Sequence, residues 1–187
     1  MNYRQIILTT VAFFLATQLT LSIAYAQAAS QSSSETVSPT TVDYQLPYPG
    51  MLPDNPLYFL KAFRDNLTTL FLSKPLDKAQ FDLMQSDKNV ESSYLLVTQE
   101  AGKTDLAVKT FTQGQEEFSE AIAQVTSAKK QGYSITDLSK KLELSNQKHI
   151  QILNLLEQHD GQNNSQWSQN QHNQANIYTK EIKALRP

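Results

Sequence analysis

The feature that most constrains the fold is a seven-residue repeat in the middle of the chain. Small and apolar residues recur there at alternating steps of four and three: Ala107, Phe111, Gly114, Phe118, Ala121, Val125 and Ala128. An α-helix places residues at this spacing on one face. Every second position is small, which lets a neighbouring helix approach closely while the large residues fill the space beside it. The repeat therefore predicts a long helix over residues 104–131 that packs tightly against another helix.

Weaker versions of the same pattern predict the remaining helices. Apolar residues recur at helical steps over residues 56–72, 76–101, 135–159 and 166–185. The stripe of the last segment is half polar, and Gly102 and Gly132 are typical helix ends. No strand pattern appears, and the connections between the long helices are short. We therefore expect an all-α, up-down antiparallel bundle of about four long helices with a shorter first helix and a proline-rich strap.

The N-terminal region resembles an export signal followed by a tether. Arg4 precedes an apolar run over residues 6–23, and Ala24-Tyr25-Ala26 fits the small-x-small site of a signal peptidase. We expect residues 1–26 to be cleaved and the protein to be exported, in the periplasm, cell envelope or medium. An uncleaved anchor is the alternative, because the run is long enough to span a bilayer. Residues 27–43 are rich in Ser, Thr and Gln and are expected to form a flexible linker.

The strap over residues 44–55 is the candidate contact region. Its closely spaced prolines restrict φ and remove backbone donors, which favours an extended chain. Proline and tyrosine bind partners at low entropic cost, although we favour the interpretation that the strap covers its own bundle. Together with the start of the first helix it supplies the predicted partner-contact residues Tyr48, Pro49, Met51, Tyr58 and Phe59.

Several chemistries have no support in the sequence. The chain has no cysteine and a formal net charge of −2, which disfavours thiolate chemistry and nucleic-acid binding. Its histidines, His149, His159 and His172, are too far apart to share a helix face as metal ligands. His149 falls on an apolar seam and is expected to be a structural histidine bonded to an oxygen. We predict no catalytic residue, no cofactor and no metal site.

Two further groups are expected to be structural. Glu116, Glu117 and Glu120 form an acidic cluster that we interpret as the solvated face of their helix. Trp167 stands in a Gln- and Asn-rich tract, where an exposed indole would favour glycan or peptide binding. A weakly packed terminal helix is the simpler interpretation.

The strap and the start of the first helix also resemble a known family. Residues 46–61 read LPYPGMLPDNPLYFLK, which resembles a bacterial domain family of unknown function with an LPYPG-x-LPD-x-PLY-x-LK block. The similarity extends over about residues 44–160. The resemblance implies an exported, all-helical protein. It implies no activity, cofactor or catalytic residue.

Three functional hypotheses follow. The first is an exported, non-catalytic binding or scaffolding module of the bacterial envelope, with an unidentified protein partner. The alternative is a peripheral membrane-surface protein that uses the apolar first helix, although we expect that helix to be buried on more than one side. The third is an enzyme or metal binder built around His149 from residues that converge only in the fold. The oligomeric state stays open.

Overall fold

A computed structural model describes residues 42–99, 103–160 and 164–186. The chain divides into one unit over residues 1–39 and a second over residues 40–187, and all described residues belong to the second. The expected signal peptide and almost all of the expected linker lie outside the described residues. Among the residues that are described, no helix is both long and apolar enough to cross a bilayer.

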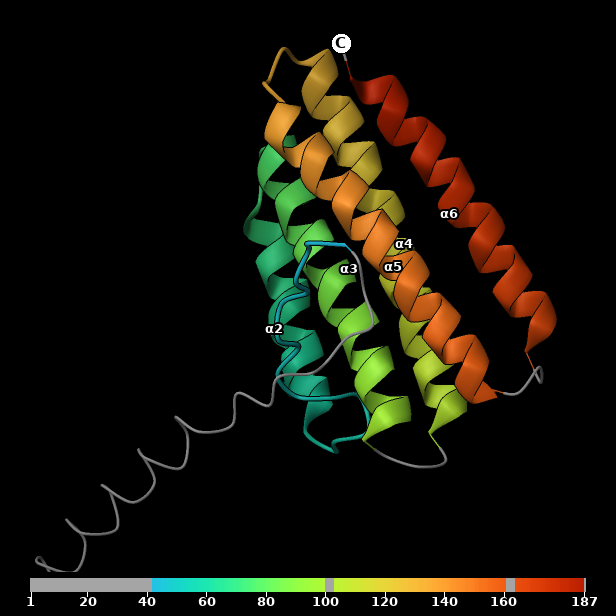
Figure 1. The fold of residues 1–187 in the computed structure, drawn as a ribbon. Coiled ribbons are helices and arrows are strands. Elements are labelled where there is room, and N and C mark those ends of the chain that lie inside the picture. The colour runs from blue at the N-terminus through green and yellow to red at the C-terminus, as the bar shows by residue number, and fades with distance from the viewer. Residues whose placement is uncertain (1–41, 100–102, 161–163, 187) are drawn as a thin grey trace, which may run out of the picture. The chain divides into compact units, whose positions relative to one another are not determined.

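The second unit is an all-α, up-down bundle (Figure 1). Within the described ranges every regular element is a helix, which confirms the predicted fold class. The helices are α2 (Tyr58–Phe71), α3 (Pro75–Thr98), α4 (Thr104–Lys130), α5 (Thr136–Asp160) and α6 (Ser165–Leu185). Short connections join them, so each helix runs opposite to the one before it.

The predicted small-residue seam forms the contact between α3 and α4. All seven seam residues of α4 are buried. At Gly114 an added Cβ would lie 3.1 Å from the carbonyl oxygen of Ser86 and 3.1 Å from Cγ2 of Val90. The absence of a side chain at this position is therefore what allows the two helices to approach so closely.

The apolar core has two clusters with a polar layer between them. One cluster, around Phe118 and Leu142, fills the end of the bundle where α4 and α6 finish. The other, around Phe111 and Ile152, fills the opposite end. Asp87 and His149 lie between the clusters along α3 and α5 and are buried as well. The fold thus places polar side chains between the two apolar clusters.

α6 packs more firmly than its half-polar stripe predicts. Ala175, Tyr178, Ile182 and Leu185 are buried. Near its start, the Trp167 ring meets Phe111 edge-on at 5.7 Å, and its Nε1 donates to Oγ1 of Thr112 at 2.9 Å. The indole is therefore part of the α4–α6 contact, which argues against its use as a free ligand platform.

Candidate functional site

α2 differs from the other helices because it has no buried residue. Its polar side, which includes Lys61, Asp65 and Thr69, lines a pocket formed with α3 and α4. Its apolar residues face away from the bundle, so the expectation that this helix is buried on more than one side was wrong. We call these residues the outer face of α2: Phe59, Leu60, Phe63, Leu67, Leu70 and Phe71.

The strap holds α2 through polar contacts. Nζ of Lys61 donates to the carbonyl oxygens of Pro49 at 2.9 Å and Met51 at 3.4 Å, and it lies 5.1 Å from the ring centroid of Tyr58. Burial lowers the pKa of Lys61. At the turn before α2, Asp54 forms an ion pair with Lys103 at 2.7 Å. A polar attachment of this kind leaves the apolar side of the helix free of contacts with the bundle.

The predicted contact residues are divided between two environments. Tyr48 is 81% exposed and Phe59 is 62% exposed, while Met51 is exposed to a smaller extent. Pro49 is buried and Tyr58 is half-buried against the pocket. Tyr48, Met51 and Phe59 are therefore accessible to a partner, whereas Pro49 and Tyr58 hold the strap and α2 on the bundle.

The pocket beneath α2 is polar and has a volume of about 280 Å³. Burial raises the pKa of Glu117 on α4 to about 7, although the hydrogen bond from Asn89 at 2.8 Å opposes this shift. Burial, with the charge of Glu120, raises the pKa of Asp82 to about 6. The expectation of a solvated acidic face holds for the exposed Glu116 and Glu120 but was wrong for Glu117, which α2 covers.

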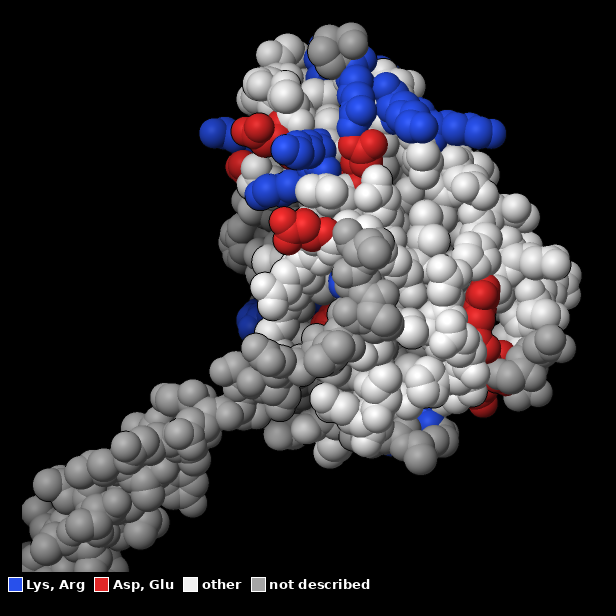
Figure 2. Space-filling model, in the orientation of Figure 1, with Lys and Arg blue, Asp and Glu red and all other residues white. Residues whose placement is uncertain are grey.

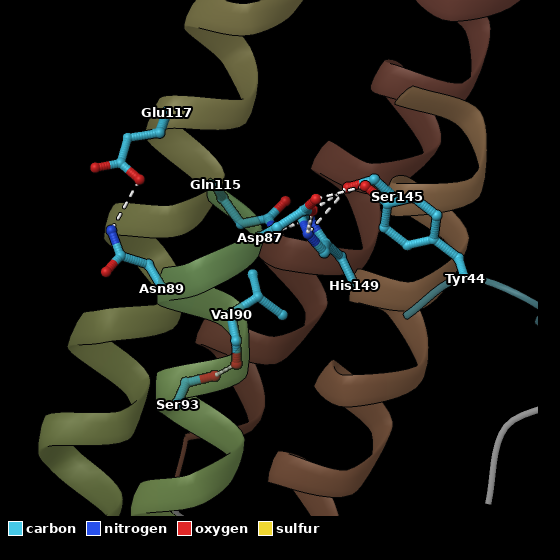
Figure 3. Close-up of polar contacts among 9 residues, drawn as sticks. All are labelled: Tyr44, Asp87, Asn89, Val90, Ser93, Gln115, Glu117, Ser145 and His149. Carbon is cyan, nitrogen blue, oxygen red and sulfur yellow. Dashed lines mark hydrogen bonds and ion pairs between the residues drawn. The ribbon is translucent and has the colours of Figure 1, made fainter. Parts of the chain in front are cut away.

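A second polar group lies in the core, where side chains from the strap, α3, α4 and α5 converge (Figure 3). Asp87 accepts hydrogen bonds from Oγ of Ser145 at 2.6 Å, from Oη of Tyr44 at 2.5 Å and from Nε2 of His149 at 3.0 Å. On the other side of the imidazole, Nε2 of Gln115 donates to Nδ1 of His149 at 3.1 Å. We call these five residues the buried polar layer.

The buried polar layer contains the residue types of a catalytic triad in a different arrangement. In a Ser-His-Asp triad the two imidazole nitrogens bridge the acid and the nucleophile. Here Nε2 of His149 meets both Asp87 and Ser145, at 3.0 and 3.1 Å. All three residues are at most 2% exposed. These hydrogen bonds connect the strap to α3 and α5. Burial and the nearby Asp87 carboxylate raise the pKa of Tyr44.

The sequence contained only part of the signal for these sites. Asp87 and Ser145 were recognisable as polar residues on apolar seams, but their pairing depends on how α3 meets α5. Of the other histidines, His172 bonds to Glu157 at 2.8 Å, and His159 is exposed. Across the described residues, no group of three or more His, Asp or Glu side chains is placed to hold a metal ion.

Comparison with known protein families gives one match. The model of a domain of unknown function (DUF5667) matches residues 50–163, more than half of the chain. The chain belongs to the DUF5667 family. The DUF5667 match includes helices α2 to α5 and the pocket beneath α2, whereas Tyr44 and α6 lie outside the match. Searches among curated proteins and among solved structures found no match to this DUF5667 protein.

Proposed function

We propose that this protein is an exported, non-catalytic binding module of the bacterial cell envelope that attaches to its partner through the outer face of α2. The observation that carries the proposal is the orientation of α2, whose polar side lies on the bundle and whose apolar side lies in solvent. A helix that faces this way gains little burial of its apolar side from its own fold. Contact with another surface would supply that burial.

The size of the outer face supports this proposal. An aromatic side chain carries roughly 150–250 Å² of surface, and Phe59, Phe63 and Phe71 are each at least 62% exposed. These three side chains alone present about 300–500 Å² of apolar surface. With the three leucines, the outer face exceeds the largest apolar patch of a typical monomer, roughly 300–600 Å². Tyr48 and Met51 on the strap are further exposed side chains.

Export and the absence of catalysis rest on different observations. The positive start, apolar run and Ala-x-Ala site of residues 1–26 support cleavage and export, and the resemblance of residues 46–61 to a bacterial family supports the envelope. The closed geometry of the buried polar layer supports a structural role for His149. An attachment module of this kind needs a rigid bundle and an exposed helix and does not need a reactive side chain.

The test is cross-linking in cells with a photoreactive phenylalanine analogue at position 63 of the full chain. The matched control carries it at Ile177, an exposed apolar residue of α6. We expect one reproducible adduct, to protein or lipid, at position 63 and none at position 177. The adduct should disappear in the L67S/L70S variant, whose helical circular dichroism should be unchanged. Equal labelling at both positions, or none at position 63, would contradict the proposal.

A further inference from the structure

Positive charge is concentrated at one end of the bundle. Nine of the 16 Lys and Arg residues lie where α3 and α5 begin and where α4 and α6 end, and eight of the nine are exposed. We call them the basic end: Lys74, Lys78, Lys129, Lys130, Lys140, Lys141, Lys180, Lys183 and Arg186. Figure 2 shows Lys and Arg side chains concentrated toward the top of the face in view, with Asp and Glu side chains among them.

The rest of the chain does not share this charge. Five carboxylates accompany the basic end, at Asp77, Asp82, Asp137, Glu143 and Glu181, which leaves an excess of four positive charges. The chain as a whole carries a formal net charge of −2. The positive end is therefore a local feature that the overall composition does not explain.

Helix stabilisation accounts for only part of the basic end. Lys129, Lys130 and Lys183 lie in the last turns of α4 and α6, where a positive charge interacts favourably with the helix dipole. Lys74 and Lys78 instead lie at the start of α3, where the dipole disfavours them. The helix dipole therefore does not explain the placement of Lys74 and Lys78, and only Lys78 has a carboxylate neighbour on α3, at Asp82.

The outer face of α2 reaches toward the same end of the molecule. α2 runs toward the basic end (Figure 1), and a connection over residues 72–74 joins it to α3. Its last two residues, Leu70 and Phe71, are 79% and 82% exposed, more than any other residue of the outer face. Exposed apolar side chains therefore end close to Lys74 and Lys78. Apolar residues beside clustered lysines are typical of proteins that bind anionic membrane surfaces.

We infer that the surface that covers the outer face of α2 is an anionic lipid bilayer. In this arrangement Leu70 and Phe71 enter the headgroup region, and the basic end lies against the lipid phosphates. This inference rests on the proposed function, because it names the partner of the same face. Charge complementarity favours the bilayer over a second copy of the chain, whose basic end would be repelled in a parallel dimer.

The experiment measures vesicle binding by the exported chain after removal of its leader, which retains the whole unit over residues 40–187. The vesicles contain phosphatidylcholine alone or with about one third phosphatidylglycerol, a composition chosen to give an anionic surface. We expect binding to the anionic vesicles in 50 mM salt to be at least tenfold stronger than in 500 mM salt or to neutral vesicles, since salt screens surface charge.

Two variants and two matched controls locate the contact. L70S/F71S should lower the affinity at least tenfold by removing the inserted side chains. Neutralising Lys140, Lys141, Lys180 and Lys183 with glutamine should have an effect of similar size and weaken the salt dependence, because five of the nine basic residues remain. The controls are I177S on α6 and K109Q in the first half of α4, away from the basic end, and both should bind like the unmodified chain.

The outcomes separate this inference from the proposed function. If neither vesicle is bound but position 63 still forms a specific protein adduct in cells, the bilayer is the wrong partner and the attachment face stands. A dimer that dissociates in L70S/F71S would identify a second copy of the chain instead. Binding that is unchanged by both sets of substitutions would also overturn the inference. If position 63 forms no adduct and neither vesicle is bound, both proposals fail.

Discussion

α2 and α4 are both amphipathic helices, yet they relate to the fold in opposite ways. α4 has ten buried residues, including Phe118 at 0% exposure, whereas α2 has none. In α4 the apolar face meets α3, α5 and α6, and in α2 the apolar face meets solvent. Periodicity therefore predicts that a helix has an apolar face, but it does not predict whether the protein's own core covers that face.

The difference arises because the core is complete without α2. Residues of α3, α4, α5 and α6, with Leu46 of the strap and Ile135 before α5, make up both buried apolar clusters. The surface left for α2 carries Asp82, Asn89 and Glu117, which are polar. A polar surface pairs with the polar side of an amphipathic helix, since buried polar groups need hydrogen-bonding partners. The apolar side of α2 is then directed outward.

The largest expected effect comes from removing one phenylalanine from α4 and comparing it with the same change in α2. F118A should lower the free energy of unfolding by about 3–5 kcal/mol, because it leaves a cavity in the core. F63A should change it by less than about 0.5 kcal/mol, because that ring is already 64% exposed. Urea denaturation of the two variants measures both values. Equal losses would show that the outer face of α2 is buried in the folded monomer.

A smaller effect is expected at the buried polar layer. D87A removes the acceptor of Tyr44, Ser145 and His149, and it should lower the free energy of unfolding by about 3 kcal/mol because buried donors are left unpaired. Y44F is the matched variant, which removes a single hydrogen bond and should cost about 1 kcal/mol. If D87A were no more damaging than Y44F, the layer would not link the strap to the core.

The smallest effect concerns Glu117, at the boundary between α2 and α4. Its pKa is raised from 4.5 to about 7 by burial, so the fold is favoured while this carboxyl is protonated. That contribution is complete below about pH 4.5 and is lost as the pH rises through about 7. Relative to E117Q, the unmodified chain should therefore lose about 2 kcal/mol of unfolding free energy between pH 5 and pH 8.

The control for this pH dependence is E116Q, a change of the exposed neighbour on the same helix. It should leave the pH profile of the unmodified chain in place. A profile for E117Q that matched the unmodified chain would show that α2 does not cover the Glu117 carboxyl in solution.

Local patterns predicted most of the fold and little of the candidate site. The alternation of small and large residues from Ala107 to Ala128 predicted a close contact with a neighbouring helix, because such a contact needs small side chains at regular positions, and the structure shows α3 as that neighbour at Gly114. His149 was correctly expected to be a histidine bonded to an oxygen. Its partner Asp87 lies 62 residues away, and no local pattern relates residues at that separation.

The sequence by itself determined the helices, their antiparallel order and the amphipathic character of α2, because these depend on residues a few positions apart. Only the tertiary structure decided which side of α2 faces the bundle, which glutamate is covered and which charges gather at one end. The first two features depend on the polar surface that α3 and α4 present after their own seam is buried, and the third depends on how the ends of α3, α4, α5 and α6 come together. Helices α3 to α6 complete the apolar core without α2, so α2 packs on the outside of the bundle.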